Sequence, residues 1–98
     1  MRAAFATRGA AGTAQLVVHG RRRPDDGAPR ATVVAGKAVG TAVRRNRVKR
    51  RLRAALAQAT LPAGFDIVVV GRPTAADAPF DVLRQDLDGA LTKLVRRS

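Results

Sequence analysis

Few side chains in this sequence could carry out acid–base, nucleophilic or metal chemistry. His19 is the only histidine, and the chain contains no cysteine and no glutamate. Thiol nucleophiles, disulfides and zinc-finger sites are therefore excluded. Asp25 and Asp26 are adjacent, but they fall in a segment rich in turn-forming residues, where aspartate commonly hydrogen-bonds its own backbone. We therefore predict no catalytic residue in this chain, and its pattern identifies no metal ligand.

The strongest chemical signal is cationic and lies between Lys37 and Arg53. This segment holds eight basic residues within an acid-free stretch that runs from Gly27 to Phe65. A helix here would place four polar side chains on one face, at spacings of three and four: Asn46, Lys49, Arg50 and Arg53. The opposite face would carry an apolar stripe that includes Val48, Leu52 and Leu56. One side of the helix is thus suited to a protein core and the other to a ligand.

A polyanion is the expected ligand of this helix. The whole chain has a formal net charge of +12, with 19 Lys and Arg against seven acids. Like charges three or four residues apart on a helix repel each other and lower its stability. Contact with phosphates would relieve that repulsion and release counterions, with a log–log salt slope of about −0.9 per phosphate on duplex. We therefore favour nucleic-acid binding over a merely solvated basic surface.

The elements that must position this helix alternate between strand and helix patterns. We expect strands at 15–19, 31–35 and 65–70, a hairpin loop at 21–29, and helices at about 41–60 and 79–95. At 98 residues the chain has the size of one domain with one modest core. The predicted fold is therefore an α/β (α+β) two-layer sandwich, with helices packed on a short central sheet.

The segment from Lys37 to Arg53 resembles the signature of the bacterial ribonuclease P protein component. That signature is a Lys, a Val-Gly turn, an Ala-Val pair, and then Arg-Asn-x-x-Lys-Arg-x-x-Arg on a helix. Its Arg-Asn-Arg core falls on Arg45, Asn46 and Arg47. The likeness fixes about ten positions without a gap and extends more loosely over roughly residues 15–96.

The resemblance implies a fold and an activity. Members of this family adopt a sandwich like that of a ribosomal protein domain, with a left-handed β-α-β crossover around the signature helix. The implied function is that of the protein subunit of ribonuclease P, which binds the catalytic RNA and the 5′ leader of precursor tRNA. The RNA, with Mg²⁺ that it mainly holds itself, cleaves off the leader and leaves the mature tRNA 5′ end. No obligatory protein partner is implied.

The resemblance also implies which residues contact RNA. Carried over position by position, the RNA-binding residues are Lys37, Arg44, Arg45, Asn46, Arg47, Lys49, Arg50 and Arg53. Family members usually begin with a longer basic helix, of which Phe5 and Arg8 are a partial match, so we assign these two residues to the leader cleft. We therefore expect residues 1–98 to form a single RNA-binding domain, in which the N-terminal helix is shortened or begins upstream of Met1.

Two other readings explain part of the same pattern. A generic RNA-binding or ribosome-associated module would account for the charge, but it has no reason to keep the whole Lys37–Arg53 spacing. A membrane-active or DNA-binding cationic protein is less well supported, because the apolar stripe is narrow and no helix-turn-helix pair appears. No apolar run is long enough for a membrane span, so we expect no membrane partner and a cytoplasmic location.

Overall fold

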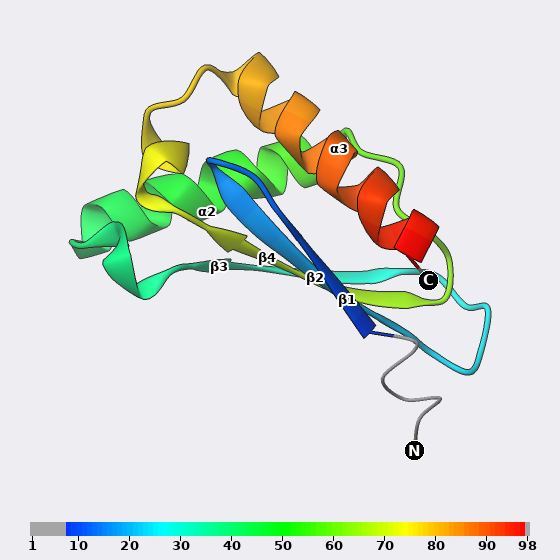
Figure 1. Ribbon diagram of the computed structural model, residues 1–98. Coiled ribbons are helices and arrows are strands. Elements are labelled where there is room, and N and C mark those ends of the chain that lie inside the picture. The colour runs from blue at the N-terminus through cyan, green and yellow to red at the C-terminus, as the bar shows by residue number, and fades with distance from the viewer. Residues whose placement is uncertain (1–7, 98) are drawn as a thin grey trace.

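The computed structural model describes residues 8–97, which form a mixed sheet with two long helices on one of its faces (Figure 1). The strands are β1 (Arg8–Gly12), β2 (Leu16–Arg22), β3 (Arg30–Ala35) and β4 (Phe65–Gly71). The long helices are α2 (Ala42–Ala57) and α3 (Phe80–Arg97), and the short 3₁₀ turns are η1 (Lys37–Val39) and η2 (Pro73–Ala76). The predicted two-layer α+β sandwich is confirmed.

The sheet has the strand order β1-β2-β4-β3. β2 pairs antiparallel with β1 and with β4, whereas β3 and β4 are parallel neighbours joined through α2. In Figure 1 both parallel strands run towards the left, α2 returns above the sheet, and β4 lies nearer the viewer than β3. This crossover is left-handed, as the resemblance implied, whereas about 98% of such connections are right-handed.

The core lies between the sheet and the two helices. Alternate residues of β2 and β4, such as Leu16, Val18 and Val69, are fully buried against them. α2 contributes Val48 and Leu52 to this layer, both without solvent exposure. The other residues of the strands point to the opposite face of the sheet, which no described helix covers (Figure 1).

Two glycines let the helices approach the sheet closely. A Cβ atom on Gly71 of β4 would lie 2.3 Å from Cγ1 of Val48 in α2. A Cβ atom on Gly20 of β2 would lie 2.2 Å from Cδ2 of Leu94 in α3. Both distances are shorter than any van der Waals contact, so a side chain at either glycine would force the helix residue above it to shift.

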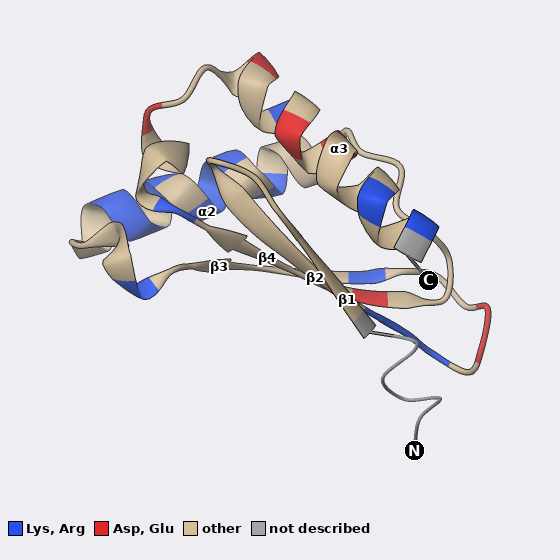
Figure 2. Ribbon diagram, in the orientation of Figure 1, with Lys and Arg blue, Asp and Glu red and all other residues tan. Residues whose placement is uncertain are grey.

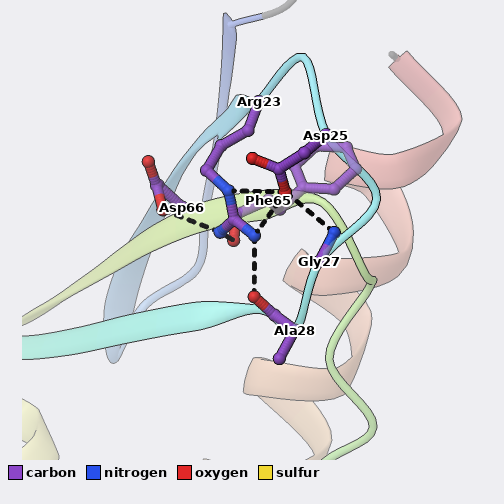
Figure 3. A network of polar contacts seen from close by, with 6 residues as sticks. All are labelled: Arg23, Asp25, Gly27, Ala28, Phe65 and Asp66. Atoms are coloured by element: carbon purple, nitrogen blue, oxygen red, sulfur yellow. Dashed lines mark hydrogen bonds and ion pairs between the residues drawn. The ribbon is translucent and has the colours of Figure 1, made fainter.

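The segment between β2 and β3 is held by Arg23, whose side chain is only 10% exposed (Figure 3). Its guanidinium pairs with Asp25 at 3.1 Å and with Asp66 at 3.0 Å. It also donates to the carbonyl oxygens of Ala28, at 2.8 Å, and Phe65, at 3.2 Å. The hairpin loop predicted at 21–29 is wrong, because β4 lies between β2 and β3 in the sheet.

The structure also differs from the predicted elements near the N-terminus. β1 was not predicted, since its Arg-Gly-Ala-Ala-Gly sequence has no β-branched or aromatic residue; pairing with β2 makes it a strand. β2 continues through Gly20 to Arg22, because that glycine makes room for Leu94 and does not end the strand. The shortened N-terminal helix was expected within Met1–Gly9; residues 1–7 lie outside the described residues, and Arg8 and Gly9 belong to β1.

Candidate nucleic-acid interface

The signature helix begins at a turn that the sequence sets up locally. Gly40 has a φ of +99°, a conformation that residues with a side chain rarely adopt. Thr41 follows as the N-cap, and its side-chain oxygen accepts a hydrogen bond from the Arg44 N–H at 3.4 Å. Val39 just before this turn is buried, which anchors the start of the helix to the core. The turn therefore directs α2 back across the sheet.

Three arginines of α2 face η2 and the chain that follows it. Arg44 donates to Oδ2 of Asp77 at 3.0 Å and to the carbonyl oxygen of Pro73 at 3.5 Å. Nε of Arg47 donates to the carbonyl oxygen of Ala76 at 2.7 Å. Arg51 donates to two carbonyl oxygens, that of Ala75 at 2.7 Å and that of Ala78. These three guanidinium groups are therefore engaged within the protein.

Arg45 lies on another side of the same helix and is half-buried. Its guanidinium nitrogens donate to the carbonyl oxygens of Ala35 and Gly36, each at 3.4 Å. Ala35 is the last residue of β3 and Gly36 follows it, so Arg45 links the helix to the end of the edge strand of the sheet.

The remaining polar residues of α2 form an exposed ridge, which we define as Asn46, Lys49, Arg50 and Arg53. Asn46, Arg50 and Arg53 are exposed and Lys49 is half-exposed. Within residues 8–97 none of these four side chains makes a hydrogen bond or an ion pair. Basic residues follow α2 along its length in Figure 2, with no acidic residue on the helix. The ridge therefore presents unpaired donors to solvent.

The structure divides the predicted RNA-binding residues into two groups. The ridge residues lie together on one face, and Lys37 is exposed in η1, before the helix begins. Arg44, Arg45 and Arg47 instead hydrogen-bond to the protein itself. Phe5 lies outside the described residues, and Arg8 belongs to β1, although its side chain is not described.

Sequence reasoning assigned no role to Arg51, which makes two of the contacts described above. A signal for it was present: positions 44, 47 and 51 lie at i, i+3 and i+7, so they form a row beside the apolar stripe. In this structure that row, beside the buried stripe, hydrogen-bonds back to the protein.

In the part of the chain that the structure describes, neither a group of metal ligands nor a membrane-spanning helix accompanies this surface. Within residues 8–97, no three His, Cys, Asp or Glu residues are grouped so as to hold a metal ion. In the same part of the chain no helix is both long enough and apolar enough to cross a membrane.

Comparison with known proteins decides the family. Residues 2–95 match the family described as Ribonuclease P. The chain belongs to the ribonuclease P protein family. The ribonuclease P protein component of Streptomyces avermitilis is 47% identical over 87% of this chain and 77% of its own length. That of Kocuria rhizophila is 49% identical over 76% of this chain and 69% of its own length.

A solved structure of the same family has the same fold. The ribonuclease P protein of Thermotoga maritima superposes with a TM-score of 0.74 at 27% identity, covering 94% of this chain and 88% of that protein. The ribonuclease P protein of Staphylococcus aureus, at 23% identity and a TM-score of 0.70, supports the fold alone. The resemblance, which is most specific over residues 37–53 and looser over roughly residues 15–96, is therefore matched by the fold of the described residues.

Proposed function

We propose that this chain is the protein subunit of ribonuclease P and binds the catalytic RNA through the exposed ridge of α2. The observation that carries this proposal is the set of four unpaired polar side chains on one face of a helix whose other sides are held by the protein. A rigid helix that presents charges at fixed spacing loses little conformational entropy when it binds.

The ridge is suited to RNA in both charge and chemistry. Lys49, Arg50 and Arg53 supply cations for phosphate oxygens, and arginine can contact a phosphate through two parallel hydrogen bonds. Asn46 adds no charge, but its amide both donates and accepts, so it can contact a ribose hydroxyl or a base edge. The ridge therefore combines phosphate binding, which sets affinity, with one group able to read shape.

The open face of the sheet is our proposed path for the 5′ leader of precursor tRNA. A shallow hollow on this face is lined by Gly9, His19, Gly20, Arg21, Asp66 and Val68. In the strand register Arg21 and Arg30 flank Asp66, so cations outnumber acids in this row. Arg21 and Arg30 are both exposed, and they would partly offset the repulsion between leader and RNA phosphates.

In this proposal the RNA performs the cleavage in the cytoplasm, with Mg²⁺ that the RNA mainly holds. The side chains of this protein bind and orient the RNA chains. His19 lies on the open face of β2 across from Val68, and in this proposal it takes no part in the cleavage. The protein's contribution is then tighter substrate binding and a lower Mg²⁺ requirement, through its positive charge.

Cleavage of precursor tRNA by the cognate ribonuclease P RNA at low Mg²⁺ tests the proposal. The ridge variant carries Asn46→Ala, Arg50→Ala and Arg53→Ala. The matched control carries Gln85→Ala, Arg84→Ala and Arg96→Ala, which removes the same charge and the same kind of amide from exposed positions on α3.

The wild type and the control should both stimulate cleavage strongly, and the ridge variant should not. Equal loss in the control and the ridge variant would contradict a role for the ridge. Wild-type protein that binds the RNA without stimulating cleavage would instead support a generic RNA-binding module.

A further inference from the structure

Arg51 and Arg47 connect α2 to a segment that is itself fixed to the sheet. Their guanidinium groups donate to the carbonyl oxygens of Ala75, Ala76 and Ala78. Ala75 and Ala76 have fully buried side chains, so the accepting carbonyls have little freedom to move. In Figure 1 the η2 turn lies beside α2, between the end of β4 and the chain that leads to α3.

The other end of this connection reaches the turn between β1 and β2. The hydroxyl of Thr74, within η2, donates to the carbonyl oxygen of Ala14 at 2.8 Å. The N–H of Arg72 donates to the carbonyl oxygen of Gln15 at 2.9 Å. η2 is thus held on one side by the sheet and on the other side by the arginines of α2.

We propose that Arg51, together with Arg47, is a positioning residue that fixes the rotation of α2 about its own axis and so aims the ridge at the RNA. This inference rests on the proposed function of the ridge. It assigns Arg47, which the family signature placed among the RNA contacts, to the same internal row as Arg51.

The apolar stripe alone holds the rotation of the helix weakly. Val48, Leu52 and Ala55 are the buried residues of the helix, and the hydrophobic effect that buries them is not directional. A rotation of about 20° would move a side-chain tip about 6 Å from the helix axis by about 2 Å. Such a shift exceeds the tolerance of a hydrogen bond to phosphate. Directional bonds at the side of the stripe therefore define where the ridge points.

Arginine is suited to this role in a way that lysine is not. The guanidinium of Arg51 donates from two different nitrogens to two carbonyls three residues apart. A lysine ammonium is a compact point charge on a flexible chain, and it lacks the planar fork that joins two acceptors in a fixed direction. Replacing Arg51 with Lys keeps the charge but removes the fork.

The test measures binding of the cognate ribonuclease P RNA over a series of salt concentrations. The variants are Arg51→Ala and Arg51→Lys, compared with wild type and with Arg50→Ala from the ridge. Far-UV circular dichroism and urea unfolding establish that each variant is folded. If Arg51→Ala does not fold, Arg51→Lys, which keeps the charge, carries the test.

Both Arg51 variants should bind the RNA about tenfold more weakly at every salt concentration, because the ridge loses its hydrogen-bond geometry. The salt slope should be unchanged, because the ridge cations stay near the same phosphates and still neutralise them. Arg50→Ala should make the slope shallower by about 0.7–0.9, because one phosphate contact is lost. A shallower slope for Arg51→Ala with no loss for Arg51→Lys would mean that Arg51 contacts phosphate, and it would overturn the inference. Unchanged affinity in both folded variants would leave Arg51 only a structural role and would overturn it too.

The results that would contradict the proposed function of the ridge differ from those that would contradict the positioning role of Arg51. If wild type showed no salt-dependent binding, or if Arg50→Ala left the slope unchanged, the ridge itself would not be the RNA contact. A slope change for Arg50→Ala with no effect of either Arg51 variant would reject the positioning role alone.

Discussion

Asp77 accepts a hydrogen bond from Arg44 at 3.0 Å, which joins the first turn of α2 to the chain between η2 and α3. The hydrogen bond to Arg44, followed by the positive charge of that residue, lowers the pKa of Asp77 below its usual value. Asp25 is held similarly: its pKa is lowered first by the hydrogen bond from Arg23 and then by the N–H of Gly27. Both acids are thus partners of arginines that organise loops.

The lowered pKa values predict how acid affects these two contacts. Each carboxylate stabilises the folded state above its unfolded pKa, and this stabilisation is lost as the pH falls through the lower folded pKa. NMR titration should therefore give both midpoints below about 3.9, the ordinary aspartate value. Arg44→Ala should return the midpoint of Asp77 towards that value and leave Asp25 unchanged. A normal midpoint for Asp77 in the wild type would contradict the ion pair.

Gly71 should not tolerate a side chain. Gly71→Ala places a methyl group 2.3 Å from Cγ1 of Val48, and valine is stiff at χ1, so α2 must shift. We expect urea unfolding to show a loss of about 1–3 kcal/mol. Gly89→Ala is the control, because it lies within α3 with no atom close to the new methyl group. That change should raise stability by up to about 1 kcal/mol, and a cost equal to that of Gly71→Ala would contradict the packing argument.

The N-cap of α2 should contribute to stability without contributing to RNA contact. Thr41→Ala removes the oxygen that accepts the Arg44 N–H, and a cap of this kind is worth about 0.5–2 kcal/mol. The 3.4 Å distance places the expected loss at the lower end of that range. Thermal or urea unfolding measures it, and Thr41→Ser should restore most of it. A folded Thr41→Ala protein whose salt slope for RNA binding differs from wild type would contradict this separation.

The arginines of α2 should differ in their effect on the salt dependence of RNA binding. Arg50 is exposed without a partner, whereas Arg44 is paired with Asp77. Arg50→Ala should therefore lower the slope magnitude by about 0.9 for a duplex contact, and Arg44→Ala should lower it by less. Salt titrations of binding to the cognate RNA compare the two. Equal changes would show that Arg44 leaves Asp77 when RNA binds.

Much of the fold could be predicted because several segments have one dominant pattern. The run from Phe65 to Val70 is nearly all apolar, and it became the strand that is paired on both sides. The spacing of Val48 and Leu52 predicted both the helix and its buried face. β1 was missed because its small residues carry no strand preference; pairing with β2 alone makes it a strand.

The position of the site could be predicted from the sequence. Which of its basic side chains are exposed, and which hydrogen-bond to the protein, could not. Basic residues on one helix look alike in the sequence, and the helical period places the ridge opposite the apolar stripe. Arg47 and Arg51 hydrogen-bond to the protein because they reach the carbonyl oxygens of Ala75, Ala76 and Ala78. These acceptors lie 24–29 residues after the arginines that donate to them. The row formed by Arg44, Arg47 and Arg51 can be recognised in the local sequence of α2, but the acceptors that hold it cannot. The contacts of Arg51 could therefore not be predicted from that row alone.

The parallel pairing that sets Ala35 opposite Gly71 brings together the two ends of the segment that contains α2. Taken alone, this 16-residue helix would carry seven cations and no surface for its apolar stripe, so the ridge exists only in the native chain. On the proposed function, an RNA that binds only the native state adds about 2.7 kcal/mol to the free energy of unfolding at a hundredfold excess over Kd. Copies made in excess of their RNA are then the ones exposed to proteolysis. Loss of the unbound copies would then bring the amount of this protein closer to the supply of its RNA.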